Sequence, residues 1–316
     1  MHFIDPNSSS PNPSRTIHDR FFSCLTRVQS KILIKTIDWN GMDKLYIQRM
    51  LEGSINEPFK RKGNQYVHRL EGVSGGFYLK RTSHEPARKI LRNLLRGKKA
   101  YTNSGWIYIA LKQLKSKGFL VMEPVAWSEE CWLGIWPRRG FLLVKEAVGE
   151  ELVDIVEGST SKMSRTQALR AFGEYMGLLH GAGFFFSARV HDFIVVRTID
   201  DGEEKNRLTM IDPDYYGRSP DSEVFEEDKC IASLAYACYL FLRVGHRMNL
   251  LEAHQFIIGY RGGLHSNGAA LNAGWLRKLI GLIDQHFLNH RIDTSLMKIF
   301  PDVPGLLAEK LFVTHK

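Results

Sequence analysis

The sequence has only four cysteines, and they are scattered along its 316 residues. Cys24, Cys131, Cys230 and Cys238 form no Cys-x-x-Cys pair, so neither a zinc site nor a disulfide framework is predicted. A chain without either feature is expected to work in a reducing, cytoplasmic environment.

Long apolar runs are also missing. The N-terminal sequence MHFIDPNSSSPNPSR lacks the apolar core of a signal peptide. The longest uncharged apolar run, Ile231 to Leu242, is shorter than the about 20 residues that a membrane-spanning helix needs. Neither a signal peptide nor a transmembrane helix is therefore expected.

Acidic residues are absent between Pro86 and Met122, in a chain whose net charge is +9. The same interval is rich in basic residues: Arg88, Lys89, Arg92, Arg96, Lys98, Lys99, Lys112, Lys115 and Lys117. Such a run is either a solvated helical face or a surface for phosphate-rich partners, an anionic lipid surface among them. Aromatic residues are not interleaved with these charges as in single-strand binders, so no nucleic-acid partner is expected.

The order of apolar and turn-forming residues predicts three regions. An N-terminal extension spans 1–57, in which 1–15 are rich in Ser, Pro and Asn and expected to be disordered, while 17–57 look mostly helical and irregular. A small lobe is expected over 58–147 and a helical lobe over 148–316.

Within the small lobe, YVHRLEGVSGGFYLKR (66–81) predicts a β-hairpin whose turn carries Gly72, Gly75 and Gly76. Two helices are expected next, a basic one opened by Pro86 and another over about 106–117, and then two strands in FLVMEPVAW and GFLLVKEAV. The second half reads as a helix in RTQALRAFGEYMGLLHGAG, strands in FIVV and RLTMID joined by a polar turn DDGEEKN, and helices to the end. The predicted fold class is α+β.

Four segments then stand in a characteristic order: FYLKR, LKSKGFLVMEPVAW, LLHGAGF…FIVVR and MIDPDYYGR. Together, over roughly residues 65–262, they make the chain resemble the lipopolysaccharide kinase family, the Kdo and heptose kinases, a branch of the protein-kinase-like fold. The resemblance implies a two-lobed fold with a small β-rich lobe and a larger helical lobe. It also implies ATP and Mg²⁺ as cofactors, a lipopolysaccharide precursor as substrate, and peripheral work at the cytoplasmic face of an inner membrane.

The resemblance assigns roles to particular residues. Lys80 in FYLK matches the lysine that holds the nucleotide phosphates, and Gly75 and Gly76 belong to the turn that covers them. The linker around Glu146 would lie beside the base, and Asp212 in MIDPD matches the aspartate that binds Mg²⁺. The alternatives are a solvated strand lysine at Lys80 and a turn-capping carboxylate at Asp212.

Two parts of the family's machinery do not match. Aligned without a gap, the catalytic-loop His-Arg-Asp falls on Phe186, Ser187 and Ala188, and the later Asn or His falls on Phe193. A methyl group cannot accept a proton. The helix glutamate that should hold the phosphate lysine is replaced by Ile107, and Glu85 is the carboxylate that remains at the entrance to the basic helix.

Asp192 and His191 are the candidates to replace the missing catalytic carboxylate. The alternatives are that Asp192 caps the loop or pairs with Arg189 or a nearby lysine, and that His191 is packed or solvated. Three functions therefore stay open. The chain is a nucleotide-binding pseudokinase with impaired or lost phosphotransfer, an atypical ATP-dependent kinase of a lipopolysaccharide-core sugar or lipid that uses Asp192, or a non-enzymatic basic adaptor at an anionic membrane surface.

Overall fold

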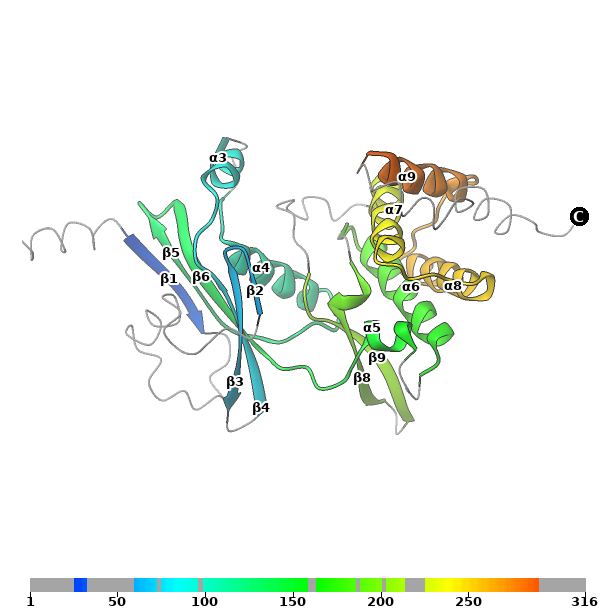
Figure 1. Cartoon of the computed structure of the whole chain (residues 1–316), viewed down its shortest axis with the longest axis horizontal. Helices are drawn as coiled ribbons and strands as arrows, with labels where there is room; N and C mark the ends of the chain where they lie inside the picture. Colours follow the sequence, from blue (N-terminus) through cyan, green and yellow to red (C-terminus); the bar gives the residue numbers. More distant parts are fainter. Residues whose placement is uncertain are drawn as a thin grey trace, which may run out of the picture. The chain divides into compact units, whose positions relative to one another are not determined.

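The computed structural model describes residues 26–32, 60–72, 75–95, 99–158, 163–185, 188–200, 203–213 and 225–289. The disorder expected for 1–15 lies outside these residues. The chain divides into two compact units (Figure 1), one made of 1–109 and 123–146, the other of 110–122 and 147–316. No helix in the described ranges is both long and apolar enough to cross a bilayer.

The first unit is built on a six-stranded antiparallel sheet. Its strands, in spatial order, are β1 (Thr26–Ile32), β5 (Pro124–Trp132), β6 (Trp136–Lys145), β4 (Gly75–Thr82), β3 (Gln65–Gly72) and β2 (Lys60–Lys62). The hairpin predicted over 66–81 is confirmed, since β3 and β4 pair along their length and Gly72 lies opposite Gly75. Gly75 has a φ of 120°, a conformation that favours glycine.

Strand β1 corrects one expectation, because it lies in the segment 17–57 that was predicted to be mostly helical. It pairs with β5 from Thr26 opposite Trp132 to Ile32 opposite Ala126. The sequence TRVQSKI has a period of two, with Arg27, Gln29 and Lys31 on alternate positions. Pairing with β5 supplies the backbone hydrogen bonds that favour a strand there.

Two helices follow β4, namely α3 (Ala87–Leu95) and α4 (Asn103–Ser116), as the sequence predicts. Two buried carboxylates bind the start of α4. Asn103 N donates to Glu85 Oε2 at 3.0 Å, and Thr102 donates through both N and Oγ1 to Glu129 Oε1 at 2.6 Å. These bonds satisfy N–H groups that have no partner within the helix, and they attach α4 to the sheet of the first unit.

The second unit combines helices with a small antiparallel sheet. Its strands are β7 (Glu150–Glu151), β8 (Phe193–Asp200) and β9 (Glu203–Met210). Its helices are α5 (Leu152–Glu157), α6 (Arg165–Gly181), the 3₁₀ turn η1 (Val190–Asp192), α7 (Glu227–Arg243), α8 (Leu250–Ser266) and α9 (Trp275–Asn289). β9 begins inside the predicted polar turn DDGEEKN, because pairing with β8 extends to Asp200 opposite Glu203.

Helices α6 and α8 approach each other closely through glycines. A side-chain carbon at Gly173 or Gly177 would lie 2.2 or 2.1 Å from a carbonyl oxygen of α8, and one at Gly259 or Gly263 would lie 2.0 or 2.1 Å from a carbonyl oxygen of α6. No real carbon fits at those distances. The α6–α8 pair is thus a backbone-to-backbone contact and the centre of the helical unit. The α+β fold class predicted from the sequence is confirmed.

Candidate functional site

Lys80 lies in β4, between Val67 of β3 and Leu142 of β6. Side chains alternate across β4, so that Phe77 and Leu79 are buried whereas Lys80 is half-buried on the other face. The Lys80 carbonyl accepts a hydrogen bond from Ser104 Oγ of α4 at 3.0 Å. Strand and helix together therefore fix the backbone from which this ammonium group projects.

Gly76 and Glu146 meet at the other end of β4. The Glu146 amide donates to the Gly76 carbonyl at 2.8 Å, and a side-chain carbon on Gly76 would lie 1.8 Å from Glu146 Oε2. The Glu146 carboxylate accepts hydrogen bonds from Arg69 Nε at 3.0 Å and from the Tyr78 hydroxyl at 3.0 Å. The bond from Arg69 is the main reason that the pKa of Glu146 lies below its usual value. Gly76 is thus required sterically, and Glu146 is held beside it.

The helix glutamate that the kinase family places beside its phosphate lysine is absent near Lys80. Ile107, which stands at the expected position, is buried in α4. Glu85 binds Lys89 Nζ at 2.6 Å through Oε1 and the Asn103 amide at 3.0 Å through Oε2. Both Glu85 oxygens therefore serve to join α3 to α4.

In the second unit, Asp192 and Asp212 lie at the same end of the β8–β9 hairpin. Asp192 immediately precedes Phe193, which pairs with Met210, and Asp212 follows Met210 by two residues. The Ile211 amide donates to the Asp192 carbonyl at 2.8 Å, which closes this end of the hairpin. The structure thus brings together two of the predicted site residues that are 20 positions apart in sequence.

Asp192 is bound by Arg189. Its side chain is 2% exposed. Oδ2 accepts from Arg189 N at 2.8 Å and Nε at 3.1 Å, and Oδ1 accepts from Nη2 at 2.8 Å. The pairing with Arg189 named as an alternative is therefore present. Burial, helped by the like charge of Asp212, nevertheless raises the pKa of Asp192 to about 6. These bonds use three of the roughly four acceptor positions of a carboxylate.

Ala188, which stands where the family has its catalytic aspartate, is 1% exposed. Phe186 and Ser187, the other two positions of that motif, lie outside the described residues. His180 of LLHGAG is fully buried between the Tyr260 hydroxyl at 2.8 Å and Ser233 Oγ at 3.1 Å. Burial lowers its pKa to about 3, so this imidazole is neutral and joins three helices rather than titrating near pH 7.

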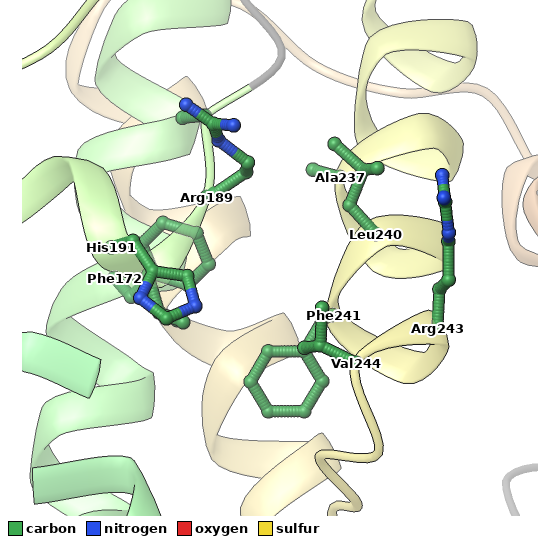
Figure 2. A pocket seen from close by; sticks show the side chains of 10 residues that line it. Phe172, Arg189, His191, Ala237, Leu240, Phe241, Arg243 and Val244 are labelled. Atoms are coloured by element: carbon green, nitrogen blue, oxygen red, sulfur yellow. The ribbon is translucent and has the colours of Figure 1, made fainter. Parts of the chain in front are cut away.

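A cavity of about 220 Å³ borders the loop that carries Ala188. Figure 2 shows Arg189 and His191 of the loop on one side and residues of α7 on the other. Most of its lining residues are apolar, and Arg189, His191 and Arg243 add nitrogen-bearing side chains. The lining residues are Phe172, Ala188, Arg189, Val190, His191, Ala237, Leu240, Phe241, Arg243 and Val244. Sequence gives no signal for the α7 side of this cavity, because only folding brings α7 to the loop.

The donors available for a divalent cation at the hairpin end are carboxylate oxygens, which Mg²⁺ prefers. Asp212 is half-buried, and Asp192 retains one acceptor position on Oδ1 beyond its bonds to Arg189. The described residues hold no cluster of three or more His, Cys, Asp or Glu side chains arranged around a metal position. Two carboxylates suit Mg²⁺ that takes its other ligands from phosphates and water.

No family model and no curated protein matches the sequence. Among solved structures, the chain is similar to WaaP in complex with acyl carrier protein, with 16% identity over 81% of this chain and 99% of that one and a TM-score of 0.49. It is also similar to the amicoumacin kinase hAmiN in complex with AMP-PNP, Ca²⁺ and Ami, with 13% identity over 85% and 94% and a TM-score of 0.44. An apo pseudokinase has 9% identity over 76% and 95% and a TM-score of 0.36.

Proposed function

We propose that this chain is a lipopolysaccharide-kinase-like protein that binds a nucleotide with a divalent cation and has lost most or all phosphotransfer. The observation that carries the proposal is a contrast between two positions, the end of the β8–β9 hairpin and Ala188 of the loop that leads into β8. Asp192 and Asp212 stand together at the hairpin end, whereas the position of the proton-accepting carboxylate is the buried methyl of Ala188. The carboxylates that would bind the cation are present, whereas the carboxylate that would accept the proton of the acceptor hydroxyl is replaced by Ala188.

For binding, Lys80 would neutralise nucleotide phosphate, and Asp212, with the remaining acceptor position of Asp192, would hold Mg²⁺. Bound Mg²⁺ neutralises phosphate charge. Its charge would also offset the repulsion between Asp192 and Asp212. The role of Asp192 in this arrangement is to position, because Arg189 holds its carboxylate in a fixed orientation.

For transfer, the acceptor hydroxyl needs a group that takes its proton, and such a group commonly contributes about 10²–10⁴-fold to the rate. Ala188 cannot do this, and Asp192 is bound by three donors of Arg189. We therefore expect phosphotransfer to a Kdo- or heptose-containing lipid A acceptor to be slower by that order or absent.

The first experiment is calorimetry of ATP binding, with and without Mg²⁺, on the wild-type chain, Lys80→Ala and Asp212→Ala. Mg²⁺-dependent binding is expected in the wild type and should weaken at least about tenfold in each variant, since charged hydrogen bonds contribute roughly 1.5–3 kcal/mol. Lys205→Ala, an exposed lysine of β9, is the control and should bind as the wild type does. Absence of binding by the wild type in both conditions contradicts the proposal.

The second function, an active kinase that uses Asp192, is favoured by the location of that carboxylate at the hairpin end. It requires measurable turnover that Asp192→Asn abolishes while ATP binding persists. Turnover that is unchanged by Asp192→Asn excludes it, and transfer at the rate of intact family members excludes the pseudokinase.

A further inference from the structure

The turn between β5 and β6 carries large apolar side chains that face solvent. Trp132, Leu133 and Ile135 are 44, 53 and 60% exposed, whereas Cys131 and Pro137 on either side are buried. We call residues 132–135 the apolar tip. Leu133 has a φ of 53°. It is the one non-glycine residue with a positive φ in the described ranges. Glycine or asparagine is favoured in this conformation, so leucine is held here against backbone preference and without burial.

Two exposed basic side chains, Lys99 and Arg138, lie near the apolar tip. Lys99 is exposed, lies over the Tyr101 ring at 5.0 Å, and is close enough for its charge to act on Glu129 and Cys131 of β5. Arg138 is exposed although it binds Glu130 Oε1 at 3.3 Å. The two carboxylates nearest the tip in sequence, Glu129 and Glu130, are buried. The exposed charge at the tip is therefore positive.

Helix α3 leaves the sheet at the same end. It follows Thr82, which pairs with Gly140 in the middle of β6, and Figure 1 shows α3 beyond the end of β4. Arg88, Leu91 and Leu95 are exposed on α3. Because β4 is antiparallel to β6, the acid-free segment from Pro86 follows β4 on the side toward which β6 begins, and this side of the first unit carries both exposed apolar and exposed basic groups.

We propose that this end of the first unit is a docking surface for an anionic lipid bilayer. The apolar tip enters the headgroup region, while Lys99, Arg138 and Arg88 contact lipid phosphates. Tryptophan favours the membrane–water boundary, and each nearby Lys or Arg adds attraction to anionic lipid. Apolar insertion and basic attraction are two separate contributions, and such a pair is what stable peripheral binding requires.

The test is co-sedimentation of the full chain, without nucleotide, with phosphatidylglycerol–phosphatidylcholine vesicles and with phosphatidylcholine alone. Binding is expected to the mixed vesicles and to weaken with salt. Leu133→Asn should lower the partition coefficient about fivefold or more, because it removes an inserted leucine. Lys99→Gln should lower it about fivefold, the equivalent of ~1 kcal/mol per charge. Leu133→Asn should melt at the same or a higher temperature, since asparagine tolerates a positive φ, so weaker binding would not reflect unfolding.

Leu251→Ser and Lys205→Gln, which change an exposed leucine and an exposed lysine of the second unit, are the matched controls and should bind like the wild type. Equal binding by Leu133→Asn and the wild type overturns the proposal, as does binding that is indifferent to anionic lipid. If the chain self-associates in the absence of vesicles and Leu133→Asn abolishes this, the apolar tip binds a second copy of the chain and the lipid proposal is wrong. Because nucleotide is absent, the result is independent of the proposed nucleotide site.

Discussion

Glu129 is a carboxylate buried in the sheet of the first unit, and it is bound on one oxygen by Thr102. Burial raises its pKa from 4.5 to about 7, although the Thr102 bonds act in the opposite direction. The fold therefore favours the neutral acid. A group of this kind contributes stability that is complete below its unfolded pKa and is lost as pH rises through its folded pKa.

At the residue scale we predict that the free energy of unfolding falls between about pH 4.5 and 7 through Glu129. The loss is up to ~3 kcal/mol, since one pKa unit corresponds to about 1.4 kcal/mol. Glu129→Gln removes this charge and should flatten the dependence, as measured by urea unfolding at pH 5 and pH 8. Glu174→Gln, on the exposed face of α6, should keep the wild-type slope. If the free energy of unfolding of Glu129→Gln falls with pH as steeply as that of the wild type, another group is responsible for the dependence.

Asp192 illustrates how far one residue can be assigned from sequence. Its type and its place before a strand made it a candidate, and the same reasoning gave loop capping or pairing with Arg189 or a nearby lysine as the alternatives. The side-chain contacts show the pairing, because three N–H groups of Arg189 donate to this carboxylate. Whether it also participates in transfer stays a prediction for Asp192→Asn.

At the scale of elements, the α6–α8 pair depends on glycine at four positions. The pattern of Gly173, Gly177, Gly259 and Gly263 is visible in the sequence, yet helix propensity alone counts each of them as unfavourable. Their use becomes clear only when the facing backbone is known, because each glycine meets a carbonyl of the other helix.

We predict that Gly177→Ala lowers the free energy of unfolding by about 3 kcal/mol, since the new carbon would lie 2.1 Å from the Tyr260 carbonyl oxygen and must separate the helices. Gly262→Ala is the control within α8, where a side-chain carbon meets nothing within 4 Å. It should raise stability by about 1 kcal/mol, because alanine favours the helix. Thermal and urea unfolding measure both, and a neutral Gly177→Ala would mean that the contact is looser.

At the scale of the whole molecule, each unit contains a buried free cysteine, Cys131 in the first and Cys230 in the second. Burial raises the pKa of both thiols to about 12. A thiol must ionise to react, so both should be inert in the folded chain.

We predict that a Cys24→Ser, Cys238→Ser variant shows negligible reaction with Ellman's reagent at pH 8 and releases two thiols per chain in urea. Cys131→Ser and Cys230→Ser, added singly, would report on one unit each. Rapid labelling of either cysteine under native conditions would contradict the burial described here and locate the unit that opens.

Local sequence was sufficient for most elements. The β3–β4 hairpin, the helices α3, α4 and α6, and the strands β8 and β9 follow from turn residues and periodicity, which depend on neighbours in the chain. Local sequence did not predict β1, because a short alternating segment becomes a strand only when another strand is present to pair with it. The end of the predicted polar turn was misplaced for the same reason, since pairing with β8 extends β9.

For the site, sequence by itself determined the residue types and their order: Lys80, a loop with Ala188 in place of a carboxylate, and Asp212 after a strand. Tertiary structure decided which groups meet. It set Asp192 beside Asp212 and bound it to Arg189, fixed Glu146 over Gly76, and left Leu133 exposed at a turn. The physical reason is that the functional group of a side chain is fixed by the residue type, which the sequence gives directly. Burial, pairing and electrostatic interaction depend on distances between residues far apart in the chain, which exist only once it has folded.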